Sequence, residues 1–271
     1  MPIYRCEHCS HHFHPISDEQ THIAQVYDDS YFVGSNEGYQ DYVAEETLQR
    51  SSARFYVRLI NRFVAKPGFA IDIGAACGFF SQEFQLAGWK CIGVEPNLSM
   101  RELAAQQFQL TMHASLQSLC SSNSLNSSEL PAYQLATMIQ VISHIPDPRA
   151  ALNTVHSLLD KNGLLLIETW DRDSLIARLS GKSWHEWNPP SVIHWFTRTT
   201  LRKLIEDEGF EFIAQGLPRK RIQIGRAVQM LRHSRKGSIA ARILTAPLTL
   251  VPVGFAIPYF LGDAFWILVR K

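Results

Sequence analysis

Charge is scarce in this chain, and it is almost balanced. Only 19% of the 271 residues are charged, and 26 Lys and Arg face 25 Asp and Glu, so the formal net charge is +1. Such a balance gives no overall attraction to nucleic acid or to an acidic partner. The chain also lacks a motif known to recognise bases, so nucleic acid is excluded as the expected partner.

The start of the chain lacks an apolar run, and cysteine is sparse. MPIYRCEHC contains no hydrophobic region of the kind that a secretory signal needs. Five cysteines are present, and only Cys6 and Cys9 are close in sequence. An odd, sparse set of cysteines without an export signal indicates reduced thiols and a cytoplasmic location.

Apolar residues, in contrast, are abundant enough for a core, at 46% of the chain. Short apolar runs alternate with helical patterns from residue 69 onward. The expected strands are 69–73, 90–94, 110–113, 133–139, 163–169, 210–215 and 264–270. The expected helices are 45–64, 79–87, 98–108, 148–160 and 198–208, and 171–196 is expected to be irregular. The alternation predicts an α/β fold with a mostly parallel sheet covered by helices on both faces.

FAIDIGAACGFF, residues 69–80, predicts a strand that enters a glycine-bearing turn and then a helix. Gly74 and Gly78 bracket the turn, whose unpaired backbone N–H groups suit an anionic or carboxylate-bearing ligand. A nicotinamide cofactor fits poorly, because Phe79 replaces the third glycine of G-x-G-x-x-G. S-adenosylmethionine fits better. Asp72 can orient its ammonium group, and Glu95 ends the second strand, where a carboxylate can accept both ribose hydroxyls.

Further motifs follow in a fixed order along the chain. After IDIGAACGFFSQEFQLAGWKCIGVEPN comes VISHIPDPRAALNTVHSLLDKNGLLLIET, and then GKSWHEWNPPSVIHWFTRTTLRKLIEDEGFE. YDDSYFVGSNEGYQDY precedes them all. Together they resemble the class I S-adenosylmethionine-dependent methyltransferases of the broad bacterial methyltransferase-domain family. The likeness runs from about residue 4 to 216 and includes the last strand. It implies a Rossmann-like, seven-stranded, mostly parallel sheet with an antiparallel last strand.

The resemblance also implies a reaction and a set of cofactor contacts. The reaction is transfer of a methyl group from S-adenosylmethionine to a small-molecule, glycan or lipid-linked acceptor. The implied contacts are Gly74, Ala75, Cys77, Gly78, Glu95, Pro96, Ser115, Leu116 and Gln140. Two residues depart from the family pattern: Ala76 replaces the usual middle glycine of the turn, and Ser143 replaces the usual Glu before the next histidine. The alternative function is a non-catalytic binding or scaffold protein with the same fold.

Two histidines are candidates for a catalytic base, which is needed only where the acceptor must lose a proton. His144 follows the fourth strand, at the edge of an open α/β sheet where ligands bind. Its alternative role is to hydrogen-bond the turn before Pro146. His194 lies near several tryptophans and either lines the acceptor pocket or serves as the base.

Two features near the N-terminus allow more than one interpretation. Tyr39 and Tyr42 either close over the cofactor as a lid or pack at the surface. Cys6 and Cys9, within CEHCSHHFH, have the spacing of one half of a zinc ribbon. Because a tetrahedral zinc site needs four ligands and usually two such pairs, we expect a remnant that binds no metal.

The chain is expected to contain four parts. These are a Cys/His-rich segment (1–26), a helical lead-in or lid (27–64), the cofactor-binding domain (65–216 with 260–271) and an insertion (217–259). Residues 217–236 carry seven Lys or Arg and no acid, and 243–262 are twenty residues without a charge. Three prolines interrupt that apolar run, which disfavours a span of the bilayer. The insertion is expected to be a peripheral contact with the inner face of a membrane, a cap over the site, or a homodimer contact.

Overall fold

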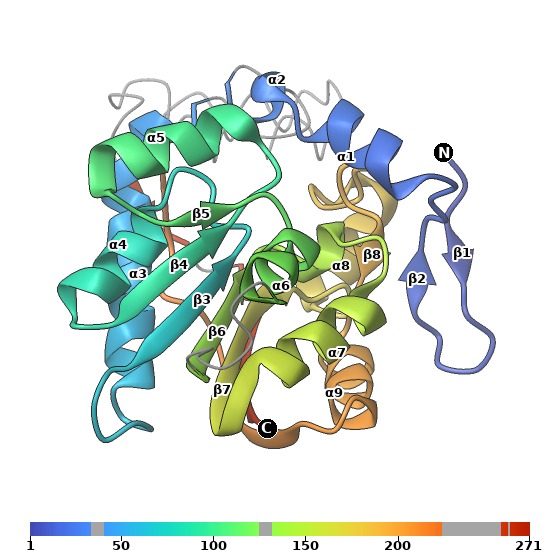
Figure 1. The fold of residues 1–271 in the computed structure, drawn as a ribbon. Helices are drawn as coiled ribbons and strands as arrows, with labels where there is room; N and C mark the ends of the chain where they lie inside the picture. The colour runs from blue at the N-terminus through green and yellow to red at the C-terminus, as the bar shows by residue number, and fades with distance from the viewer. Residues whose placement is uncertain (34–40, 125–131, 224–255, 260) are drawn as a thin grey trace.

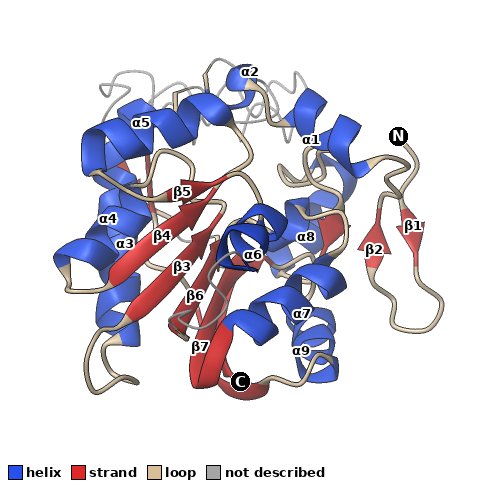
Figure 2. Ribbon diagram, in the orientation of Figure 1, coloured by secondary structure: helices blue, strands red, loops and turns tan. Residues whose placement is uncertain are grey.

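Seven strands form the central sheet. In the computed structural model, which describes residues 1–33, 41–124, 132–223, 256–259 and 261–271, they lie in the order β5-β4-β3-β6-β7-β12-β9. β12 runs antiparallel to both of its neighbours, and the other pairs are parallel. The bounds are β3 (Phe69–Ile73), β4 (Lys90–Val94), β5 (Met112–His113), β6 (Tyr133–Ile139), β7 (Leu159–Trp170), β9 (Glu211–Gly216) and β12 (Ala264–Arg270). The predicted Rossmann-like sheet with an antiparallel last strand is confirmed (Figures 1 and 2).

Helices cover both faces of this sheet. Successive side chains of a strand point to opposite faces, and in the central strands both sets of side chains are apolar. In β7, Leu164 and Leu166 pack against α3 and α4, while Leu165 and Ile167 pack against α6, α7 and α9. The helix bounds are α3 (Glu46–Ile60), α4 (Phe79–Leu86), α5 (Leu98–Phe108), α6 (Leu116–Ser124), α7 (Pro148–Leu158) and α9 (Arg198–Asp207). The predicted helices on both faces are therefore confirmed.

Shorter elements surround the sheet. β1 (Tyr4–Arg5) and β2 (His12–Phe13) form a hairpin that pairs with β8 (His194–Trp195). Two short helices, α1 (Glu19–Val26) and α2 (Asp29–Phe32), lie along the edge toward which β3 and β4 point (Figure 1). The remaining elements are the 3-10 turns η1 (Val43–Glu45), η2 (Ile142–His144) and η3 (Gly181–Ser183), with α8 (Leu175–Ser180), β10 (Arg221–Gln223) and β11 (Ala256–Pro258).

The region expected to be irregular, 171–196, contains more structure than predicted. It holds α8, η3 and β8. Ser174 caps α8 by accepting a hydrogen bond from the backbone N–H of Ala177 at 3.2 Å. Leu175 and Leu179 lie one turn apart on α8 and are exposed, and a helix of six residues is too short for its periodicity to be recognised in the sequence.

The predicted insertion 217–259 lies mostly outside the described residues. At its two ends, β10 and β11 pair in an antiparallel register, with Ile222 opposite Ile257. Among the helices that the structure describes, none has the length and apolar character needed to cross a membrane.

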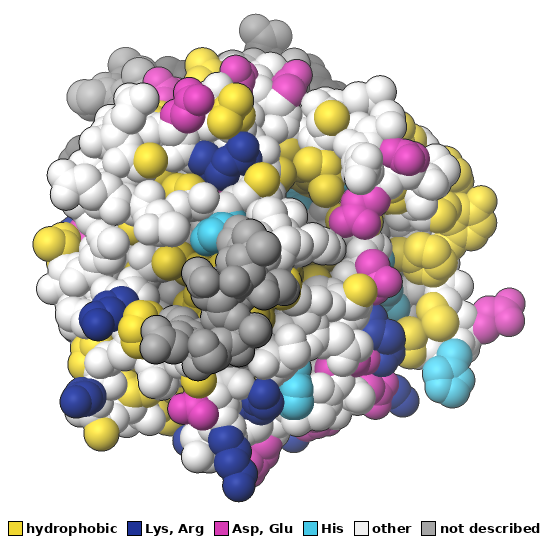
Figure 3. Space-filling model, in the orientation of Figure 1, with side chains coloured by type: hydrophobic (Ala, Val, Ile, Leu, Met, Phe, Trp, Pro, Cys, Tyr) yellow, Lys and Arg dark blue, Asp and Glu magenta, His cyan; other side chains and the backbone are white. Residues whose placement is uncertain are grey.

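Figure 3 shows one face of the molecule, on which Lys and Arg side chains are scattered among acidic ones.

A buried carboxylate ties the centre of the sheet to α4. Asp72 in β3 is 2% exposed. Its Oδ2 accepts a hydrogen bond from Ser81 in α4, and its Oδ1 accepts one from Thr137 in β6, both at 2.7 Å. Burial raises the pKa of Asp72 to about 6, and the two hydroxyl donors oppose that rise. The ionised form therefore depends on both donors.

Replacing Thr137 with Val should lower the free energy of unfolding by about 1.5–3 kcal/mol near pH 8, the range for a hydrogen bond to a charged group. The loss should shrink near pH 5, because a protonated Asp72 no longer needs the donor. Urea denaturation at both pH values measures this loss in the free energy of unfolding. The matched control is Thr154→Val in α7, whose hydroxyl donates to the carbonyl of Ala150 within the same helix. Equal losses in the two variants would contradict this role for Thr137.

Candidate active site

The turn after β3 enters the left-handed region three times. Gly74, Ala76 and Gly78 have φ values of +71°, +46° and +87°. At Gly74 an added Cβ would lie 2.2 Å from Cγ2 of Val141, so only glycine fits between β3 and the end of β6. At Ala76 the left-handed conformation costs about 1–2 kcal/mol, which the family's usual glycine avoids.

The turn leads into α4 without a side-chain cap. The N-cap residue is Gly78, and it has no side chain to accept from the first N–H groups of the helix. An uncapped helix N-terminus suits a carboxylate or another anion. Ala75 and Cys77 are buried beside it, and burial raises the pKa of the Cys77 thiol to about 12. The Cys77 thiol is therefore neutral, and the contact of Ala75 and Cys77 with a cofactor stays a prediction.

Glu95 lies directly after β4 and faces this turn. It is 4% exposed, and its Oε2 accepts a hydrogen bond from the N–H of Ala76 at 3.0 Å. Its Oε1 accepts one from the N–H of Asn97 at 2.9 Å. Burial raises the pKa of Glu95 to about 7, although the two amides oppose the rise. The two carboxylate oxygens of Asp72 accept hydrogen bonds from the hydroxyl groups of Ser81 and Thr137. A contact of Asp72 with a ligand stays a prediction.

The other predicted cofactor residues follow β4 and β5. Pro96 is exposed, and its carbonyl accepts from Arg101. Ser115 and Ser118 exchange hydrogen bonds between hydroxyl and backbone N–H, both at 3.0 Å. Leu116 is nearly buried within the core. The structure brings these residues to one edge of the sheet, and their contact with adenine stays a prediction.

Gln140 directly follows β6 and has a left-handed conformation, with φ of +61°. Its Nε2 donates to Oε1 of the buried Glu168 at 2.5 Å. The next residue, Val141, packs against Gly74. Gln140 therefore borders the glycine-bearing turn from the side of β6.

His144 lies in η2, just beyond β6, and its tautomer is defined by a carbonyl. Nδ1 lies 2.6 Å from the carbonyl oxygen of Ser191, which can only accept, so Nδ1 carries the proton. The hydroxyl of Tyr27 donates to the same carbonyl at 2.8 Å and lies 3.1 Å from Nδ1. Burial lowers the pKa of His144 to about 4, so the ring is neutral at pH 7. Within the described residues no group bonds Nε2, which keeps its lone pair.

His194 has a different environment. Its Nε2 lies 3.3 Å from the carbonyl oxygen of Pro146, and its Nδ1 lies 3.0 Å from Nε2 of His11 in the N-terminal hairpin. Both ring nitrogens are thus engaged, and burial lowers the pKa of His194. It is His194, and not His144, that bonds the turn at Pro146. Trp184 and Trp195 nearby are buried packing residues.

Three residues at the site had not been predicted: Tyr27, Asn97 and Ser191. Asn97 caps α5 and also donates through Nδ2 to the carbonyl of Tyr27 at 3.2 Å and to Asp29 at 3.0 Å. Its place before a helical pattern was a usable N-cap signal. Tyr27 and Ser191 have no such local signal, because their contacts with His144 and with each other join residues that are 47 to 164 positions apart.

The tyrosines expected to form a lid have different outcomes. Tyr39 lies outside the described residues. Tyr42 is 7% exposed and stacks on Phe79 with ring centroids 5.8 Å apart, which favours the packing alternative. In the described part of the chain, α1 and α2 are the elements that reach the site, through Tyr27 and Asp29.

Cys6 and Cys9 lie at the tip of the N-terminal hairpin. The N–H of Ser10 donates to the carbonyl of Cys6 at 2.9 Å, and Ser10 has φ of +62°. No group of three or more metal-binding side chains occurs among the described residues. The absence of bound metal stays a prediction.

The strand order, the glycine-bearing turn after β3 and the buried acid after β4 define a class I S-adenosylmethionine-dependent methyltransferase. The chain belongs to the methyltransferase-domain family, whose sequence model matches residues 46–215. It is similar to the ubiquinone biosynthesis O-methyltransferase of Cereibacter sphaeroides, with 25% identity over 153 residues. That match covers 52% of this chain and 59% of the relative, so the chain spans less than two thirds of that protein.

Solved structures share the fold. The magnesium protoporphyrin IX methyltransferase of Synechocystis PCC 6803, with bound S-adenosylhomocysteine, has a TM-score of 0.55 at 14% identity, over 94% of this chain and 100% of that one. The 1,6-didemethyltoxoflavin-N1-methyltransferase of Burkholderia thailandensis also has a TM-score of 0.55 at 14% identity, over 100% and 99% of the two chains. These structures share the fold of this chain, and the sequence model shows that the chain belongs to the methyltransferase-domain family.

Elemental analysis of the purified protein should find less than one zinc per chain, since one Cys pair supplies only half of a tetrahedral site. The Cys6→Ser, Cys9→Ser double variant should give the same reading and the same stability. A stoichiometric zinc signal that disappears in this variant would contradict the prediction.

Proposed function

We propose that the protein transfers the methyl group of S-adenosylmethionine to a small-molecule acceptor that loses a proton, such as a hydroxyl, and that His144 is the base. One observation carries the proposal. His144 is neutral, its Nδ1 proton is held by the carbonyl of Ser191, and its Nε2 lone pair is available beside the end of β6. A base in this form can accept a proton from the acceptor as the methyl group arrives.

The cofactor residues are assigned by their chemistry. The uncapped N-terminus of α4 at Gly78 suits the methionine carboxylate, and the buried carboxylate of Glu95 suits the ribose hydroxyls. Ser115 and Leu116 are proposed to meet the adenine, and Gln140 the methyl-bearing end. When bound, S-adenosylmethionine supplies an electrophilic methyl group on a sulfonium.

The two short helices α1 and α2 are connected to both sides of the site. Asn97, two residues after Glu95, binds the carbonyl of Tyr27, and the hydroxyl of Tyr27 bonds the carbonyl that holds His144. α1 and α2 are thereby tied to both the cofactor side and the base side. We propose that they exclude water, because methyl transfer depends chiefly on orientation and a dry pocket.

The acceptor class rests on two kinds of support. The curated relative is named for O-methylation in ubiquinone biosynthesis, and a structural neighbour binds 1,6-didemethyltoxoflavin, so both names concern small molecules. A glycan or lipid-linked acceptor is the alternative within the same chemistry. The insertion at which a membrane or homodimer contact is predicted lies mostly outside the described residues.

Glu95 should make cofactor affinity depend on pH. Its raised pKa of about 7 means that the carboxylate is protonated as the pH falls below neutrality, and the protonated form accepts ribose hydroxyls poorly. The Kd for S-adenosylhomocysteine should rise by about an order of magnitude between pH 7.5 and pH 6. Glu95→Gln should bind more weakly at both pH values and lose most of this slope. Calorimetry that shows the same slope in the variant would contradict the ribose assignment.

Replacing His144 with Gln should lower kcat by about 10²–10⁴-fold and leave cofactor affinity intact. The base works in its neutral form, so with saturating cofactor the wild-type kcat should stay flat down to about pH 5 and fall only toward the lowered pKa of about 4. The control is His156→Gln in α7, a histidine that packs against Phe210. Near-normal kcat in His144→Gln would contradict the role of His144 as the base. So would a wild-type kcat that already falls near pH 6.5.

A further inference from the structure

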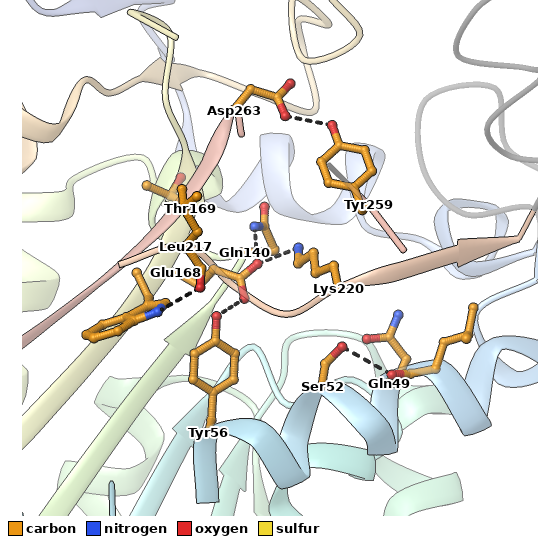
Figure 4. A network of polar contacts seen from close by, with 12 residues as sticks. Gln49, Ser52, Tyr56, Gln140, Glu168, Thr169, Leu217, Lys220, Tyr259 and Asp263 are labelled. Carbon is orange, nitrogen blue, oxygen red and sulfur yellow. Dashed lines mark hydrogen bonds and ion pairs between the residues drawn. The ribbon is translucent and has the colours of Figure 1, made fainter. Parts of the chain in front are cut away.

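A fully buried carboxylate lies beside the cofactor side of the sheet. Glu168, near the carboxyl end of β7, is 0% exposed. It accepts hydrogen bonds from the hydroxyl of Tyr56 in α3 and from Nε2 of Gln140, and the ammonium group of Lys220 forms an ion pair with it (Figure 4). Four distant parts of the chain thus meet at one side chain.

Lys220 is fixed in place by its surroundings. It lies between β9 and β10, and its side chain is 18% exposed. Its ammonium lies 4.9 Å from the centroid of the Trp170 ring, and its carbonyl accepts from the N–H of Tyr259 at 3.0 Å. Among the described residues, Lys220 is the cation paired with Glu168. Tyr56, the other titratable group that faces Glu168, stays a neutral phenol because burial raises its pKa.

Gln140 connects this network to the cofactor turn. Its Nε2 points at Glu168, as Figure 4 shows, while its neighbour Val141 fills the space beside Gly74. Any change at Glu168 that releases the amide of Gln140 therefore acts at the border of the turn.

We propose that Lys220 is a positioning residue for the S-adenosylmethionine site: it neutralises Glu168, and Glu168 in turn holds Gln140 against the cofactor turn. The inference rests on the proposed contact of Gln140 with the cofactor. It means that the connection between β9 and β10, far in sequence from the turn, sets cofactor affinity.

The physical reason is the cost of a buried, unpaired charge. A carboxylate that loses its cation in a dry environment takes up a proton or draws in water, and either change alters its hydrogen bonds. In a Lys220→Met variant the buried carboxylate of Glu168 is left without its counter-charge, and its hydrogen bond with Gln140 changes.

The test measures the Kd for S-adenosylhomocysteine without an acceptor, as the ratio of variant to wild type at pH 8. Lys220→Met should raise the Kd about tenfold. Lys220→Arg should stay within about threefold of wild type, because it keeps the charge. Lys203→Met, on the exposed face of α9, is the matched control and should change nothing.

A second comparison distinguishes positioning from direct contact. In the Glu168→Gln background there is no charge to neutralise, so adding Lys220→Met should change the Kd by less than about twofold. If Lys220→Met alone does not fold, the comparison of Glu168→Gln with the Glu168→Gln, Lys220→Met double variant still tests the proposal. A wild-type Kd for Lys220→Met near pH 8, or a tenfold loss that persists in the Glu168→Gln background, would overturn the proposal. Failure of the proposed methyl transfer would appear separately, as absent turnover in protein that still binds S-adenosylhomocysteine.

Discussion

Two backbone N–H groups hold the carboxylate of Glu95, and the organisation of the site depends on them. One belongs to Ala76 in the glycine-bearing turn and the other to Asn97 at the start of α5. From Asn97 the contacts continue to the carbonyl of Tyr27, and from the hydroxyl of Tyr27 to the carbonyl of Ser191, which holds His144. A single buried acid therefore links the cofactor side of the site to the base side, although the participants come from remote parts of the sequence.

Buried acids recur at this sheet, and each is stabilised in a different way. Asp72 receives two hydroxyl groups, Glu95 two amides, and Glu168 a phenol, an amide and an ammonium. Neutral donors leave the pKa values of Asp72 and Glu95 raised, at about 6 and about 7. The buried carboxylate of Glu168 instead has a full counter-charge, the ammonium group of Lys220. The three acids therefore differ in the kind of group that compensates for their burial.

Local sequence patterns were sufficient to predict most of the fold. The strands 69–73, 90–94, 133–139 and 264–270 and the helix 98–108 have the predicted bounds, because each is an apolar run or a helical pattern with its own end signals. The glycine turn and Glu95 were likewise visible as motifs. The contacts of Tyr27 with His144 and of Lys220 with Glu168 were not, since they are made only when the chain folds. β8 was not predicted for the same reason, because a strand of two residues is recognisable only by its pairing with β2.

A crystal structure of the protein with S-adenosylhomocysteine tests the central claim most directly, because that claim concerns which groups Glu95 binds. The account predicts that the carboxylate of Glu95 accepts both ribose hydroxyls, that the ligand carboxylate lies at the N-terminus of α4, and that Nε2 of His144 faces the open side of the ligand sulfur. The account would be contradicted by a ligand bound elsewhere, or by a Glu95 carboxylate that keeps only its two backbone partners while the ribose is held by other residues.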